Sequence, residues 1–107
     1  MKKKVFSIDA TQFRSRKEAH LHMKEVFSDY EYYGNNLDAL HDVLTSVRRD
    51  AEIDVCGLEF SRLYIGEYAD SIKRVFLDSA EENSHLTFVF SEPATAENDD
   101  GTTPENR

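Results

Sequence analysis

Three short strand-like segments, separated by stretches with helical periodicity, constrain the fold of this chain more than any other feature. Residues 4–9 alternate apolar and polar side chains, residues 51–59 contain Ile53 and Val55, and residues 85–90 form an apolar run. Because helices separate the strands, the connections are predicted to be crossovers within a parallel sheet. We expect an α/β fold in which helices pack on a three-stranded parallel sheet.

The helical stretches place apolar residues three and four positions apart. They cover residues 14–27, residues 37–47, a short stretch at 60–64, and a stretch from residue 70 or 71 to about residue 83. The residues placed to cap the longer helices are Ser15, Asn35 or Asn36, and Asp70 or Ser71. Gly57 indicates a bulge or a close backbone approach after the second strand.

The chain has 107 residues, which is the size of a single domain with one hydrophobic core. We assign residues 1–91 to a compact domain and residues 92–107 to an acidic tail. The tail has no periodic apolar residues, so burial cannot offset its ordering entropy and we expect it to be disordered. It carries five acids and one arginine, a net charge of -4 out of the formal -8.

This charge narrows the class of partner. A negative field repels the phosphates of nucleic acids and of anionic membranes and attracts a basic protein. No apolar run approaches the roughly 20 residues that cross a bilayer, and the start of the chain lacks a signal-peptide core, so we expect a cytoplasmic protein. Cys56, the single cysteine, lacks the neighbours of a zinc site and is predicted to be a small buried hydrophobe.

The segment from Asp29 to Asp42 is acidic and rich in tyrosine, and it contains no lysine or arginine. Asp38 and Asp42 are four residues apart, so a helix places both carboxylates on one face, where they repel each other by a few tenths of a kcal/mol. One interpretation is a solvated pair, stabilised because both acids lie in the first two turns of the helix. The other is a docking face for arginine and lysine.

A divalent-metal or acid–base site built from Asp38, Asp42 and His41 is the third interpretation, and no ligand cluster or nucleophile motif supports it. His41 lies between the apolar stripe and the acidic face, where it could contact a partner or be a half-buried structural residue. His20 and His22 fall on different faces of the first helix, and we expect both at the surface. We predict no catalysis, no metal and no cofactor.

Residues 32–45, which read Tyr-Tyr-Gly-Asn-Asn-Leu-Asp-Ala-Leu-His-Asp-Val-Leu-Thr, resemble the defining segment of the barstar family of intracellular ribonuclease inhibitors. The resemblance extends from residue 2 to about residue 91 and implies a three-stranded parallel sheet with helices packed on it. It also implies that Asp42 occupies the place of a substrate phosphate in a ribonuclease active site. By the same resemblance Asp38 pairs with a further cation, Tyr32 stacks on the catalytic histidine, and Asp78 contacts the rim.

The sequence departs from the family at four positions. His41 and Val47 replace two tryptophans, Ser46 replaces a glycine, and Asp78 replaces a glutamate. Since aromatic anchors carry much of an interface's energy, these departures imply a differently shaped target. The predicted partner-binding residues are Tyr32, Asn36, Asp38, His41, Asp42, Thr45, Ser46 and Asp78. The leading hypothesis is a monomeric inhibitor that binds a basic ribonuclease one to one, as an immunity protein where that nuclease is a toxin. The alternative is an acidic adaptor for a basic protein that is not a nuclease.

Overall fold

The computed structural model describes residues 3–30 and 34–93. Along these residues the elements are β1 (Lys4–Asp9), the 3-10 turn η1 (Ala10–Gln12), α1 (Arg16–Val26), α2 (Leu37–Thr45), β2 (Ala51–Cys56), α3 (Leu58–Ile65), α4 (Tyr68–Glu82) and β3 (Leu86–Ser91). The predicted α/β fold class is confirmed. Each predicted strand and helix is present, with ends that move by up to three residues.

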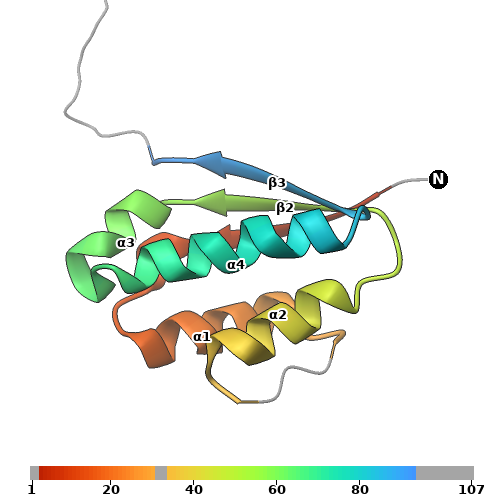
Figure 1. Cartoon of the computed structure of the whole chain (residues 1–107). Helices are drawn as coiled ribbons and strands as arrows, with labels where there is room; N and C mark the ends of the chain where they lie inside the picture. The colour runs from red at the N-terminus through yellow and green to blue at the C-terminus, as the bar shows by residue number, and fades with distance from the viewer. Residues whose placement is uncertain (1–2, 31–33, 94–107) are drawn as a thin grey trace, which may run out of the picture.

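The sheet is parallel, with β2 between β1 and β3. Phe6 of β1 pairs with Ile53 of β2, which pairs in turn with Phe88 of β3, so an apolar row crosses the sheet. Helices α1, α2 and α4 lie on one side of the sheet, and α3 lies at the carboxyl end of the strands (Figure 1). Side chains on the other side of the sheet, such as Val5 and Val89, are exposed.

Local capping explains where the helices on the core side begin. Ser15 Oγ accepts a hydrogen bond from the Glu18 amide at 3.0 Å, and Asn36 Oδ1 accepts one from the Ala39 amide at 2.8 Å, which confirms the cap at Ser15 and selects Asn36 over Asn35. The predicted cap at Asp70 or Ser71 is wrong, since α4 begins at Tyr68 without a side-chain cap. Packing of the buried Ala69 starts this helix earlier than the polar residues indicate.

The first helix contributes an unexpected residue to the core. His20 was expected at the surface, but it is fully buried, with Nε2 2.7 Å from the hydroxyl of Tyr68. Burial lowers the pKa of His20 and raises the pKa of Tyr68. The prediction failed because the buried face of α1 includes the polar His20 in addition to the apolar Ala19 and Met23. His22 is half-buried and accepts a hydrogen bond from the Asp9 amide at 3.1 Å.

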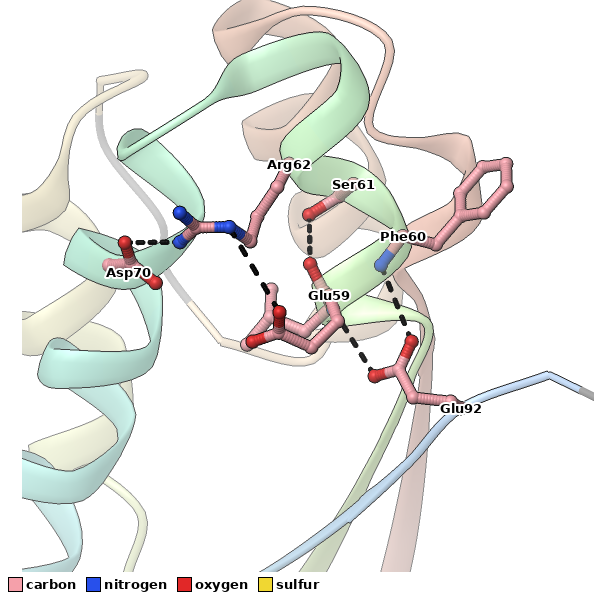
Figure 2. A network of polar contacts seen from close by, with 7 residues as sticks. Glu59, Phe60, Ser61, Arg62, Asp70 and Glu92 are labelled. Atoms are coloured by element: carbon pink, nitrogen blue, oxygen red, sulfur yellow. Dashed lines mark hydrogen bonds and ion pairs between the residues drawn. The ribbon is translucent and has the colours of Figure 1, made fainter.

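The junction of β2 and α3 depends on Gly57, whose φ of 85° is left-handed. A Cβ at this position would lie 2.5 Å from Thr11 Cγ2, so the close approach predicted at Gly57 is confirmed. Gly57 offers no side-chain cap, and the carboxylate of Glu92 binds the amides of Glu59 and Phe60 in its place, at 3.2 and 3.3 Å (Figure 2). This contact ties the end of β3 to α3.

Two further expectations from the sequence concern the burial of Cys56 and the absence of membrane-spanning helices. Cys56 is half-buried and not fully buried, because the core-facing positions of β2 are Ala51, Ile53 and Val55 and Cys56 lies on the alternate face. Within the described ranges, no helix combines the length and the apolar character needed to cross a membrane. Residues 94–107, which include almost all of the predicted tail, lie outside the described part of the chain.

Candidate partner-binding surface

The two aspartates of α2 point away from the core. Leu40, Val43 and Leu44 are buried on one face of this helix, and the spacing of Asp38 and Asp42 puts both on the opposite, exposed face. Neither carboxylate forms a hydrogen bond or ion pair with any residue in the described ranges. Both are therefore open to a partner.

The end of α2 changes the electrostatic account of this pair. The sequence predicted a helix to residue 47 and both acids in its first two turns, where the macrodipole favours negative charge. The helix ends at Thr45, so Asp38 lies in the first turn and Asp42 in the last. The macrodipole therefore stabilises Asp38 and opposes Asp42. Local stabilisation explains less of the pair than the sequence suggested.

The second helix of the surface is α4, which packs along α2. Asn83, at the end of α4, donates hydrogen bonds from Nδ2 to the carbonyls of Leu44 at 3.0 Å and Val47 at 2.9 Å. These bonds fix the two helices to each other. We use the name acidic face for the exposed carboxylates of α2 and of the last two turns of α4, which are Asp38, Asp42, Asp78, Glu81 and Glu82.

The ends of both helices carry this charge against their dipoles. Asp78, Glu81 and Glu82 lie in the last two turns of α4, and its last turn holds no basic residue. An acid near a helix C-terminus is unfavourable by roughly 0.3–1 kcal/mol at low ionic strength. Of the acidic face, only Asp38 therefore lies where a helix dipole favours its charge.

Glu82 is a residue of this surface that the sequence reasoning missed. His41 Nε2 lies 3.1 Å from Glu82 Oε2, and this contact bridges α2 and α4. The imidazole is half-buried at the junction of the two helices, and so it is both structural and accessible to a partner. The two residues are 41 positions apart, and their contact depends on how α4 packs on α2. The periodicity of α4 alone could place Glu82 at the surface but could not pair it with His41.

Comparisons with known proteins agree with this architecture. The profile of the family described as Barstar (barnase inhibitor) matches residues 3–92, which is most of the chain. The chain belongs to the barstar family. It is also 36% identical over 76 residues, 70% of this chain and 84% of the relative, to the protein of Bacillus subtilis (strain 168) named "Putative ribonuclease inhibitor YrdF".

Three of the polar residues predicted from the barstar resemblance also serve the helix that carries them. The side-chain oxygen of Asn36 accepts the capping hydrogen bond from the Ala39 amide. Gly34 has a positive φ, and a Cβ at Gly34 would lie only 3.0 Å from Asn36 Nδ2. The hydroxyls of Thr45 and Ser46 donate to the carbonyls of His41 at 2.8 Å and Val43 at 2.7 Å. These hydroxyls can still accept a hydrogen bond from a partner.

Two positions that matter in barstar proteins remain. Tyr32 lies outside the described residues, so its role stays a prediction. Val47, at one of the two tryptophan positions, is buried in the core and adds nothing to the surface. Of the two residues that replace family tryptophans, His41 and Val47, only His41 reaches the surface.

The metal site considered for Asp38, Asp42 and His41 can be compared with the structure. Within residues 3–30 and 34–93, no group of three His, Cys, Asp or Glu side chains is arranged to hold a metal ion. His41 is engaged by Glu82 and not by either aspartate of α2. The arrangement is suited to contacting cations on another protein.

Proposed function

We propose that this barstar-family protein inhibits a basic ribonuclease by placing the acidic face in the active site of that enzyme. Asp42 takes the position of a substrate phosphate among the cations of the nuclease, and Asp38 binds a further arginine or lysine. The observation that carries the proposal is the pair of exposed carboxylates on α2 without a partner in the described ranges. The family description and the name of the relative, which both refer to inhibitors, support it.

The geometry suits phosphate mimicry for a physical reason. A carboxylate presents two oxygens that accept charge-assisted hydrogen bonds from a guanidinium, as a phosphate does. Asn36, Asn83 and the His41–Glu82 contact fix the helices before binding, so little conformational entropy is lost on association. We further propose a one-to-one complex, and a role in immunity where the nuclease is a toxin.

The proposal predicts that association is fast at low ionic strength and slows strongly as salt is added. The test mixes the protein with a panel of basic ribonucleases and measures association rates, together with cleavage of an RNA substrate. We expect salt-sensitive inhibition that competes with RNA and is lost in the double variant Asp38→Asn/Asp42→Asn. Asp50→Asn, which removes an exposed aspartate outside α2 and α4, is the matched control.

Two results would contradict this function. Inhibition that persists unchanged in the double variant would show that the acidic face is not the binding site. Tight binding of a basic protein that leaves all RNA cleavage intact would favour the adaptor alternative.

A further inference from the structure

A small cluster of cations lies at the start of α1, where two of its guanidinium groups stack on tyrosine rings of α3 and α4. The guanidinium of Arg14 lies over the ring of Tyr64 at 4.4 Å, and that of Arg16 lies over the ring of Tyr68 at 4.6 Å. Lys17 follows Arg16 in the first turn of α1 and is exposed. We call Arg14, Arg16 and Lys17 the basic pole.

The cations of the basic pole are not neutralised by the rest of the fold. Among the described residues none of the three forms an ion pair, in a chain whose net charge is -8. Arg16 and Lys17 also occupy the start of a helix, where the macrodipole disfavours positive charge. An anionic ligand would offset both effects.

An exposed aromatic and apolar surface adjoins these cations. Leu63 is 76% exposed and Tyr64 46% exposed, and the ring of Phe60 lies 6.0 Å from that of Tyr64. Figure 2 shows Phe60 and Arg62 of α3 pointing in different directions, so the Phe60 ring lies away from the Arg62–Asp70 contact. A chain segment crossing α3 would cover Phe60, Leu63 and Tyr64.

The chain reaches this surface immediately after β3. The carboxylate of Glu92 binds the amides of Glu59 and Phe60 (Figure 2). A Cβ on Gly57 would lie 3.7 Å from Pro93 Cδ. The eight residues of α3 span about 12 Å. Residues 94–99 reach up to about 20 Å when extended, which is enough to carry Glu97 and Asp99 past Tyr64 to the basic pole.

We propose that the chain's own acidic segment, residues 94–107, binds the basic pole and lies across the exposed face of α3. The segment holds four acids against one arginine, and the acids begin within reach of the cations. Because the segment is covalently attached next to its site, its effective concentration is about millimolar, so weak charge contacts are sufficient.

This contact has a consequence for the whole molecule. A basic pole left open could bind the acidic face of a second copy, which is a head-to-tail contact that does not close. The bound segment occupies the pole within one chain and leaves the acidic face free. The proposal does not depend on the identity of the partner, or on the function proposed above.

The test locates the segment by paramagnetic relaxation in the full-length chain. A spin label is attached at Thr103→Cys in a Cys56→Ser background, and amide signals are recorded at about 0.01 M and about 1 M salt, where the Debye length falls from roughly 30 to 3 Å. We expect selective signal loss at Arg14, Arg16, Leu63 and Tyr64 at low salt, with recovery at high salt. A mixture of isotope-labelled chains with spin-labelled, unlabelled chains distinguishes contact within one chain from contact between copies.

Matched variants complete the experiment. Arg14→Gln/Arg16→Gln should abolish the signal loss, whereas Arg48→Gln/Arg49→Gln, which removes two exposed cations outside α1, should not. The proposal is overturned by signal loss that occurs only in the mixed sample, by loss centred on other surfaces, or by its absence at low salt. The variants' amide spectra report folding directly, so a misfolded variant is recognised and the salt series on the parent chain still decides the question.

Discussion

Carboxylates are abundant at the α3 end and on the acidic face, but the two regions use them differently. At the α3 end Arg62 pairs with Asp70 and with Glu59, and Glu92 binds two backbone amides (Figure 2). On the acidic face Asp38, Asp42 and Asp78 have no such contact with the described residues, and only Glu82 is engaged, by His41. Carboxylates at the first region complete the fold, whereas those at the second are left for another molecule.

The difference shows how a structure separates structural charge from binding charge. A carboxylate that caps a helix or meets a guanidinium adds a modest amount to stability. Unpaired carboxylates that repel one another or oppose a helix dipole reduce stability slightly. Because these exposed carboxylates add nothing to the fold, their presence on one surface favours a role in binding.

The largest expected effect comes from removing a carboxylate of the acidic face. Asp42→Asn should weaken binding to the inhibited nuclease by about 2–5 kcal/mol, because the cations that surround it in the complex are left without a counter-charge. Stability of the free protein should be unchanged or slightly raised, since the repulsion with Asp38 disappears. Calorimetric titration measures the affinity and urea unfolding measures the stability.

Asp70→Asn provides the control at the α3 end. It removes one carboxylate that is paired with Arg62, so it should leave the affinity unchanged and slightly lower the stability. If the two variants behaved alike in both measurements, the distinction between the regions would be wrong.

The sequence was sufficient to predict the architecture and to place Asp38 and Asp42 on the exposed face of α2. Periodicity in residues 37–47 shows a helix with one buried face, and the four-residue spacing of Asp38 and Asp42 follows from it. The residues that fix this helix in space could not be found in the same way. Asn83 and Glu82 meet α2 from the other end of the chain, and only the packing of α4 on α2 brings them there.

The failures of prediction have a common cause in tertiary packing. His20 is polar, yet it enters the core because Tyr68 satisfies its imidazole. Similarly, α4 begins at Tyr68 and not at Asp70, since packing of its first turn outweighs the capping preference. A local pattern cannot show which polar residue finds a partner from a distant segment.

The next effect in size tests the connection that holds the acidic face together. Asn83→Ala removes the donor to the carbonyls of Leu44 and Val47 and should lower the free energy of unfolding by about 1–3 kcal/mol. Exchange of the α2 amides with deuterium should accelerate more than exchange at α3. Asn35→Ala, an exposed asparagine without a side-chain bond to the described residues, should leave both unchanged.

A pH measurement tests the buried polar pair beneath the α3 end. Burial lowers the pKa of His20, so the unfolded chain binds a proton there more readily than the folded one. The stabilising contribution is complete above the unfolded value near 6.5 and is lost as the pH falls below it, by at most about 1.4 kcal/mol per pH unit. Urea unfolding at about pH 7.5 and pH 5.5 should show this slope.

Two histidine variants separate this effect from surface titration. His20→Gln should remove the part of the slope near pH 6, whatever its own stability. His85→Gln, at an exposed histidine that contacts Asp50, should retain it. A slope that survives in His20→Gln would show that another group is responsible.

The smallest expected effect is the change in stability when one carboxylate is neutralised in each region. The sign of this change should differ between the α3 end and the acidic face. Glu92→Gln keeps an oxygen near the amides of α3 but removes the charge that interacts with the helix dipole, so stability should fall by about 0.3–1 kcal/mol at low salt. Glu81→Gln makes the same change in the last turn of α4 and should raise stability by a similar amount. Thermal unfolding at low and at high salt measures both, and salt should reduce both differences. Equal signs would mean that the helix dipoles do not distinguish the two sets of carboxylates.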